Sequence, residues 1–214
     1  MIGSQWAVYE QVALPNGNLH FYPAAHAITN PSGGVEFSMP NATTSSPAYA
    51  NYLLNAYTAS LSYSDTITAK INIVPSSAAT TFVGNPDGHN SAMSFVRLFI
   101  QSNLPHGTYA DCIATGNSNY WWATPTDGST GSYTFGTENY SATLSVTLNP
   151  TDWSNVCGLP ANYNSSTLSS FYASIANIKY FGLSFGSGGF LANGVGVNGT
   201  TGMAIFQLEN YTIK

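Results

Sequence analysis

Aromatic and basic side chains between residues 93 and 123 carry the groups best suited to bind a ligand. The apolar segment Met93–Gln101 is typical of a strand, whose alternation would place four side chains on one face: Phe95, Arg97, Phe99 and Gln101. Aromatic rings cover the C–H faces of sugars, and the forked guanidinium group of arginine can donate to vicinal hydroxyls. The segment therefore predicts a sheet face that binds carbohydrate. The structural alternative is that Arg97 pairs with a carboxylate or with backbone carbonyls beneath a helix over residues 165–178.

A second aromatic group follows at Asn119-Tyr120-Trp121-Trp122. If this segment is extended, Tyr120 and Trp122 point to one side of the sheet and Trp121 points to the other. We expect Tyr120 and Trp122 to share the face that carries Arg97, where Tyr120 or Trp122 would stack on the ligand. The alternative is that both tryptophans are buried, one at each interface of a sheet covered on both sides, because tryptophan is highly buried on average.

Catalytic patterns are weak in this sequence. Residues 182–186 (GLSFG) match the G-x-S-x-G pattern of hydrolases, but that motif needs a following helix, and the glycine-rich residues 187–202 cannot form one. The match is therefore predicted to lie in a strand. None of the four histidines is spaced like a pair of zinc ligands. A glycosidase needs two carboxylates that flank one bond, and no local pattern among the nine acidic residues singles out such a pair.

Glu36 and Glu209 differ from the other acids because each lies in an apolar, strand-like segment. A buried carboxylate needs a partner, and four basic residues are too few to supply one for every acid. A bound calcium ion would satisfy both carboxylates through oxygen ligation. The alternative is that both side chains lie on an exposed strand face.

The elements that must position these side chains are mostly strands, because apolar and polar residues alternate with a period of two. We expect strands over residues 6–12, 19–22, 35–39, 57–64, 66–74, 93–101, 141–149, 178–186 and 202–213. Residues 57–64 and 66–74 would form a hairpin. Helical spacing predicts a helix over Ser165–Ile178, capped by Ser165 or Ser166, and a weaker helix over Ser46–Ala56.

Frequent turn signals separate these segments, such as Asn85-Pro86-Asp87-Gly88. Many short strands joined by such turns predict an all-β fold, an antiparallel β-sandwich of jelly-roll type with one or two short helices. No linker divides the sequence. We therefore expect residues 1–214 to form a single β-sandwich domain.

Charge excludes two classes of partner. Of 214 residues only 6% are charged, the net charge is −5, and the four basic residues are scattered. Nucleic acids and anionic membrane surfaces both require clustered lysine and arginine, so neither is expected to bind. No apolar run approaches the ~20 residues of a membrane span, so membrane insertion is not expected. A surface rich in Ser, Thr, Asn, Gly and Tyr suits a neutral polysaccharide instead.

The cysteines and glycosylation sequons favour secretion. Cys112 and Cys157 could form one disulfide in an oxidising compartment, and two buried free thiols are the alternative. The chain is also a candidate glycoprotein, because it contains N-x-S/T sequons at Asn41, Asn139, Asn164, Asn198 and Asn210. We therefore expect a secreted, extracellular or cell-surface protein.

Four segments together resemble the jelly-roll carbohydrate-binding modules (galactose-binding-like) of secreted polysaccharide-degrading systems. They are Gly33–Pro40 (GGVEFSMP), Phe95–Gln101 (FVRLFIQ), Asn119–Trp122 (NYWW) and Ile205–Ile213 (IFQLENYTI). The resemblance implies a non-catalytic module that binds polysaccharide. In such modules an acid in an early strand and an acid in the last strand often hold a structural Ca²⁺, which would carry over to Glu36 and Glu209. The family usually has two adjacent acids where this chain has Glu209-Asn210.

Three functional hypotheses follow. The first is a secreted, non-catalytic module that binds neutral polysaccharide through stacking by Tyr120 or Trp122, Phe95 and Phe99 and through hydrogen bonds from Arg97 and Gln101. The second is a self-assembling extracellular protein, such as a surface-layer, filament or capsid-like jelly roll, because a surface of low charge resists association weakly and apolar edges can add strands. The third is a glycosidase or lyase. Catalysis is thus left open, with the lack of a recognisable carboxylate pair counting against it.

Overall fold

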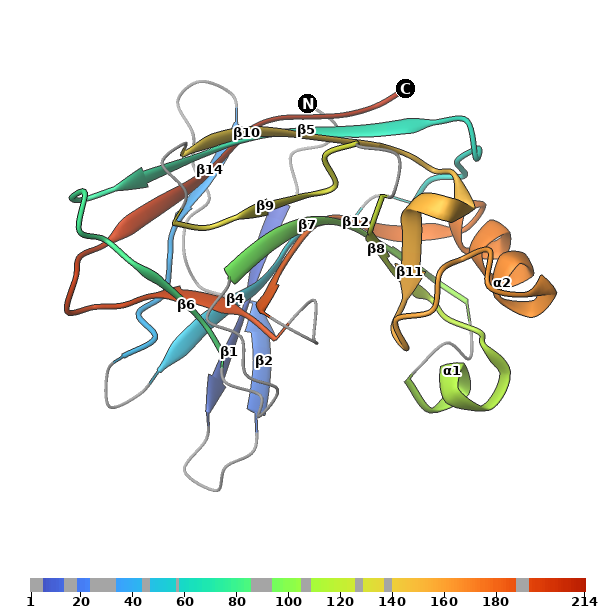
Figure 1. Ribbon diagram of the computed structural model, residues 1–214, viewed down its shortest axis with the longest axis horizontal. Coiled ribbons are helices and arrows are strands. Elements are labelled where there is room, and N and C mark those ends of the chain that lie inside the picture. Colours follow the sequence, from blue (N-terminus) through green and yellow to red (C-terminus); the bar gives the residue numbers. More distant parts are fainter. Residues whose placement is uncertain are drawn as a thin grey trace.

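The computed structural model describes residues 6–13, 19–23, 34–43, 47–56, 58–85, 94–104, 109–125, 129–136, 140–187 and 193–214. Within these ranges two antiparallel β-sheets pack face to face, and two short helices lie at one end (Figure 1). The predicted all-β antiparallel sandwich with one or two short helices is confirmed. Alternation builds both layers, because every second side chain of a strand faces the core.

The smaller sheet has four strands in the described chain, in the order β10-β5-β14-β3. Their bounds are β3 (Val35–Ser38), β5 (Thr66–Pro75), β10 (Ser141–Thr147) and β14 (Ala204–Ile213). β5 shows the expected alternation clearly, since Ile67 and Ile71 are buried and Lys70 is exposed. One face of this sheet therefore meets the core and the other meets solvent.

The larger sheet has ten strands among the described residues, with the path β11-β8-β7-β12-β4-β1-β2. Off this path, β9 pairs with β7, and β13 pairs with β4 and β6. The bounds are β1 (Trp6–Ala13), β2 (Leu19–Pro23), β4 (Ala48–Asn55), β6 (Phe82–Gly84), β7 (Ser94–Ser102), β8 (Tyr120–Ala123), β9 (Ser132–Thr134), β11 (Trp153–Asn155), β12 (Ile178–Ser187) and β13 (Val195–Val197).

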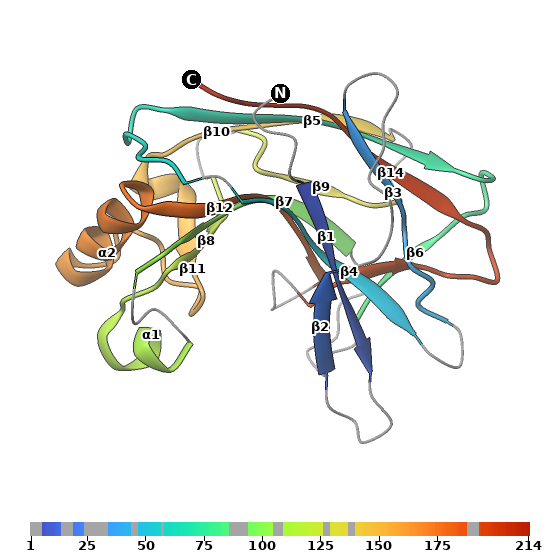
Figure 2. The ribbon, with the colours of Figure 1, turned by 180° about the vertical axis from the view of Figure 1, so that it is seen from behind.

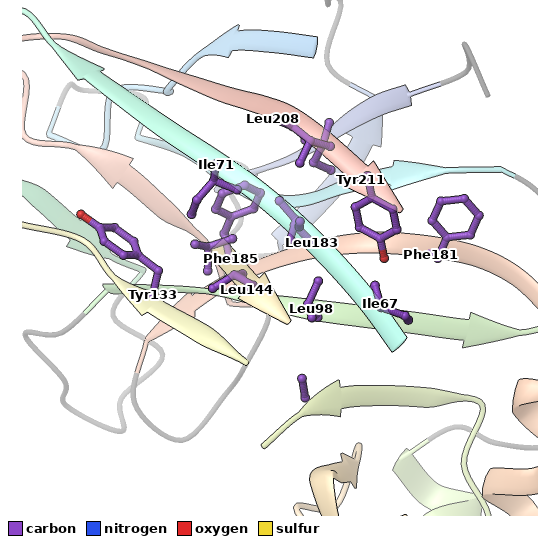
Figure 3. Close-up of a cluster of buried hydrophobic side chains, with 14 of the residues drawn as sticks. Ile67, Ile71, Leu98, Tyr133, Leu144, Phe181, Leu183, Phe185, Leu208 and Tyr211 are labelled. Atoms are coloured by element: carbon purple, nitrogen blue, oxygen red, sulfur yellow. The ribbon is translucent and has the colours of Figure 1, made fainter. Parts of the chain in front are cut away.

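The core lies between the two sheets (Figure 3). Burying each large apolar side chain there contributes about 1.5–3 kcal/mol to folding. Fully buried side chains come from both layers: Ile67, Ile71, Leu208 and Tyr211 from the smaller sheet, and Leu98, Phe181, Leu183 and Phe185 from the larger one.

Helix α2 (Ser165–Ile175) lies beside β8 and β11 and provides the second layer at that end of the sandwich (Figure 1). Its buried Phe171 ring has its centroid 5.0 Å from that of Trp121 on β8 and 6.4 Å from that of Trp153 on β11. The serine cap predicted for this helix is wrong. Asn164 is the N-cap, and its side-chain oxygen accepts a hydrogen bond from the Thr167 N–H at 2.9 Å. Asparagine suits this position at least as well as serine.

Helix α1 (Tyr109–Thr115) has no counterpart among the sequence predictions. Its buried Cys112 forms a disulfide with Cys157, with Cα atoms 6.1 Å apart, so the predicted disulfide is confirmed. Cys157 follows β11, which in turn follows a single 3₁₀ turn, η1 (Pro150–Asp152). A helix of seven residues is too short to be stable alone, and the disulfide ties it to the end of the larger sheet.

Two predicted elements are wrong. Of the helix predicted over residues 46–56, the structure describes residues 47–56, which contain β4 instead, a strand that is buried along most of its length. Apolar residues on both faces of a strand can imitate helical spacing. Residues 58–65 form no strand, and instead link β4 of the larger sheet to β5 of the smaller one, with a bridge between Ala59 and Ile178. β5 therefore pairs with β10 and β14 rather than in a hairpin with residues 57–64.

The larger sheet is curved (Figures 1 and 2). β7 and β12 lie below the smaller sheet in Figure 1, while β1 and β2 on one side and β11 on the other extend away from it. The face that turns away from the core, called the outer face below, therefore lies on the inside of the curve.

Candidate functional site

β8 places the two adjacent tryptophans on opposite faces. Trp121 is fully buried in the core against Phe171 of α2. Trp122 pairs with Phe99 of β7 and lies on the outer face with Tyr120. The centroids of the Tyr120 and Trp122 rings are 6.4 Å apart, and the ring planes are inclined by 19°. The alternation expected for this segment is present.

Six aromatic residues from β1, β4, β7, β8 and β12 cluster on the outer face, and we call them the aromatic face: Tyr9, Tyr52, Phe99, Tyr120, Trp122 and Tyr180. Phe99 lies at the centre, with its ring centroid 5.0 Å from that of Tyr52 and 5.2 Å from that of Trp122. The four tyrosines are partly exposed, whereas Phe99 is 0% and Trp122 5% exposed. The tyrosines therefore form the surface that a ligand can touch, and Phe99 and Trp122 support them.

The small residues of β12 explain how rings from separate strands come into contact. The outer side of β12 carries Gly182 and Ser184, and Gly182 pairs with Phe99 of β7. β4 lies on the other side of β12. The Tyr52 ring from β4 and the Phe99 ring from β7 therefore meet across the glycine, 5.0 Å apart. A side chain at Gly182 would collide with the backbone carbonyl of Leu53.

Arg97 lies on the outer side of β7, with its guanidinium carbon 5.3 Å from the centroid of the Phe95 ring. The alternative in which the helix covers Arg97 is wrong, because α2 packs on the core side of the sheet through Phe171 and Trp121. Within the described chain no carboxylate forms an ion pair with Arg97, and its Nε atom is buried without a hydrogen-bond partner. In the part of the chain that the structure describes, this cation thus contacts a ring rather than an anion.

Gln101, also on the outer side of β7, sits between two tyrosines of the aromatic face. Its register partners are Tyr120 on β8 and Tyr180 on β12. The side chain is partly exposed, so its amide can both donate and accept hydrogen bonds. The sequence-predicted residues Phe95, Arg97, Phe99, Gln101, Tyr120 and Trp122 therefore all lie on one face of the sheet.

The hydroxyls of Tyr9 and Tyr52 stay protonated across the physiological range, because the pKa of each is raised. Burial, followed by the neighbouring Tyr120, raises the pKa of Tyr52 above the ordinary value near 10. Burial, followed by the neighbouring Tyr180, raises the pKa of Tyr9. The face therefore offers rings together with uncharged hydrogen-bond donors.

Because it contains buried tyrosines, the protein is expected to lose folding stability at high pH. Burial raises the pKa of the core residue Tyr211, as it does for Tyr52, so deprotonation is harder in the folded than in the unfolded chain. This contribution to stability is complete below the unfolded pKa of about 10 and is lost as the pH rises above it, by about 1.4 kcal/mol per pH unit for each such tyrosine. Urea unfolding at neutral pH and at about pH 11 measures the loss.

Tyr211→Phe provides the control for this prediction. The Tyr211 hydroxyl has no hydrogen-bond partner within the described chain, so its removal should not lower stability at neutral pH. The variant should lose less stability than the wild type at high pH. An equal alkaline loss in both proteins would show that Tyr211 does not contribute.

The G-x-S-x-G match lies inside β12, as the sequence predicts. Ser184 is fully buried between β7 and β4, where its register partners are Arg97 and Tyr52. A serine nucleophile must be exposed on a turn to reach its substrate. Ser184 therefore acts as a small spacer beneath the rings.

Glu36 and Glu209 lie in the smaller sheet, on strands β3 and β14, rather than in the large sheet that carries the aromatic face. The Glu36 carboxylate accepts a hydrogen bond from Gln207 at 2.9 Å, and Glu209 forms an ion pair with Lys70 at 2.7 Å. No group of three or more His, Cys, Asp or Glu side chains is gathered among the described residues. A Ca²⁺ ion at Glu209 would compete with Lys70 for the carboxylate, so the calcium site stays a prediction, and the function proposed below does not depend on it.

Four of the five glycosylation candidates fall within the described chain. Asn41, Asn164 and Asn210 are exposed, and Asn198 is partly exposed. Asn139 lies outside the described residues. None of these four sites lies in a strand that carries the aromatic face.

Three tyrosines of the aromatic face, Tyr9, Tyr52 and Tyr180, are absent from the sequence predictions. For Tyr180 the signal is present: in residues 178–186, large apolar residues alternate with Tyr180, Gly182 and Ser184. Tyr52 was hidden by the incorrect helix over residues 46–56. Tyr9 occupies an alternating strand but shares no local pattern with the other rings, because its neighbours in the fold are distant in sequence.

Comparison of the sequence with protein families and with curated proteins assigns no function to this face. No protein-family model matches the chain, and no curated protein matches its sequence. None of the described helices is long and apolar enough to cross a membrane. The class that the fold defines is an all-β antiparallel sandwich with one disulfide, and the functional assignment rests on the aromatic face.

Proposed function

We propose that this chain is a secreted, non-catalytic β-sandwich that binds a neutral polysaccharide on its aromatic face. Sugars present flat C–H surfaces and many uncharged hydroxyls, so rings with neutral donors and acceptors bind them well. The four partly exposed tyrosines supply both ring surface and hydroxyl groups, and the Gln101 amide adds a donor and an acceptor between two of them.

The clustering of six aromatic rings outside the core is the observation that supports this proposal most strongly. Aromatic side chains are normally buried between layers, and an exposed patch of them on a soluble domain usually marks a binding surface. The rings come from five strands of one sheet, so the scaffold holds them rigidly. A rigid surface binds an extended chain without a large loss of its own conformational entropy.

Affinity gel electrophoresis against soluble glucan, xylan and mannan tests the proposal. We expect retardation by at least one polysaccharide and a loss of affinity of about tenfold, or about 1.4 kcal/mol, in Tyr120→Ala. Tyr63→Ala is the matched control, because Tyr63 is 63% exposed and contacts Tyr172 of α2 rather than the aromatic face. Unretarded migration in all three gels, or equal losses in both variants, would refute the proposal.

Self-association of an extracellular structural protein is the second candidate, and one observation favours it. Val74 of β5 and Ile205 of β14 are register partners on the outside of the smaller sheet, 42% and 38% exposed, and the nearby Met203 is 75% exposed. Apolar side chains gathered in this way can form a contact between copies. Light scattering over a concentration series tests this: a mass that rises with concentration and falls in Ile205→Lys supports it, and a constant monomer mass contradicts it.

A further inference from the structure

Arg97, the single arginine of the chain, is a partly buried cation with no anionic partner among the described residues. Within the described residues it forms no ion pair, and its Nε atom is buried without a hydrogen bond. Its stacking on Phe95 at 5.3 Å offsets part of the cost of desolvation. Burial accordingly lowers the pKa of Arg97, but a guanidinium group stays charged at any physiological pH. The described part of the site therefore holds a positive charge with an unpaired Nε–H donor.

A cavity of about 410 Å³ lies next to Arg97. It exists because β8 and β9 lie along the same edge of β7 but pair with different parts of it: β8 with Phe99–Gln101 and β9 with Phe95–Arg97. Besides Arg97, its lining includes the hydroxyl-bearing residues Thr124, Ser129, Thr130 and Ser132. The volume falls within the range of about 300–1,000 Å³ that is usual for small-molecule sites.

We propose that this cavity binds the carboxylate of a single acidic sugar residue within an otherwise neutral polysaccharide, an inference that rests on the proposed function. The forked guanidinium group matches a carboxylate through two parallel hydrogen bonds. Arg97 lies two residues from Phe99 on β7, or about 6.7 Å along the strand, so one glycan chain can contact both the cavity and the aromatic face.

Net charge selects a sparsely acidic ligand over a polyanion. The chain carries −5 in total, and one of its four basic residues, Lys70, is already paired with Glu209. A polyanion would be repelled by the protein as a whole, whereas one carboxylate at Arg97 completes a single ion pair. The aromatic face, with its uncharged donors, would hold the neutral units on either side.

Isothermal titration with matched oligosaccharides tests this inference. The probes are cello-, xylo- and mannohexaose, the same three chains carrying one uronic acid residue, and the methyl esters of those acidic chains. For whichever backbone binds, we expect the acid to bind about five- to tenfold more tightly than the neutral chain, and its methyl ester to lose that gain. Raising the ionic strength from about 0.01 M to 1 M should also reduce the gain.

Two substitutions locate the effect. Arg97→Gln should remove the preference for the acid, so that the acidic chain and its methyl ester bind with equal affinity, and Arg97→Lys should restore only part of that preference. Asp127→Asn tests whether an acid that is close in sequence to the cavity residues Pro125 and Ser129, and that lies outside the described residues, is the natural partner of Arg97. If Asp127→Asn strengthens binding of the acidic chain tenfold, Arg97 has an internal counter-ion and the inference is wrong.

The outcomes separate this inference from the proposed function. Equal affinity for the neutral, acidic and esterified chains would overturn the carboxylate site and leave polysaccharide binding intact. Absence of binding by any of the nine oligosaccharides would overturn both. The comparison of acid with ester uses only the wild-type protein, so it decides the question even if the Arg97 variants fail to fold.

Discussion

Replacing Trp121 with alanine is expected to lower the free energy of unfolding by about 3–5 kcal/mol while leaving glycan affinity unchanged. Trp121 is fully buried, and the centroid of its ring lies 5.0 Å from that of Phe171 in α2. The substitution leaves a cavity between β8 and the helix that the surrounding side chains cannot fill. Urea unfolding measures the loss, and titration under native conditions measures the affinity of the folded protein.

Trp122→Ala is the matched variant, because the two tryptophans are adjacent in sequence but face opposite sides of the sheet. Trp122 supports Tyr120 and Phe99 on the aromatic face, so we expect a smaller loss of stability, about 1–3 kcal/mol, and a loss of glycan affinity of about tenfold. A larger loss of glycan affinity in Trp121→Ala than in Trp122→Ala would show that the glycan does not bind on the face that carries Trp122.

Gly182→Ala is expected to destabilise the fold by about 2–6 kcal/mol, although it adds a single methyl group. Gly182 has a φ of +154°, which residues with a side chain rarely adopt and which costs of order 1–3 kcal/mol. A Cβ atom would also collide with the Leu53 carbonyl of the paired strand β4, and crowding of this kind adds about 1–3 kcal/mol. Chemical denaturation of the wild type and of Gly182→Ala measures the total loss of unfolding free energy.

Gly158→Ala separates the cost of the positive φ from the cost of the steric collision. Gly158 also has a positive φ, of 76°, but a Cβ atom there would meet no other atom within 4 Å. It should therefore lose only the conformational contribution, about 1 kcal/mol. Equal losses at Gly158 and Gly182 would mean that the close approach of β12 to β4 does not matter, and would weaken the explanation of how Tyr52 reaches Phe99.

The strands that alternate cleanly were predictable because a single periodicity decides them. Residues 66–74 and 141–149 have one buried and one exposed face, and both are strands of the smaller sheet. The sequence of β4 lacks this alternation because both faces of the strand are buried. Its apolar residues are therefore spaced in a way that fits a helix as well as a strand. Helix α1 gives little signal because it is short and is tied to the fold by the disulfide at Cys112.

The candidate site was predictable only where it is local in sequence. Alternation alone placed Phe95, Arg97, Phe99 and Gln101 on one face, and it separated Trp121 from Trp122. The contact between Tyr52 and Phe99 depends on the order of β4, β12 and β7, and strand order is a property of the whole fold. The full burial of Phe99 follows from that contact, so its supporting role could not be predicted from its own segment.

Titration monitored by ¹⁵N NMR of the tryptophan indoles tests the central claim most directly. The chain has four tryptophans, of which Trp6, Trp121 and Trp153 lie in the core and Trp122 lies on the aromatic face. With cello-, xylo- and mannohexaose added in turn, the account predicts that the Trp122 indole signal shifts in a saturable manner while the three core signals stay in place. Saturable shifts at a core tryptophan with Trp122 unmoved, or no shift with any of the three glycans, would contradict it.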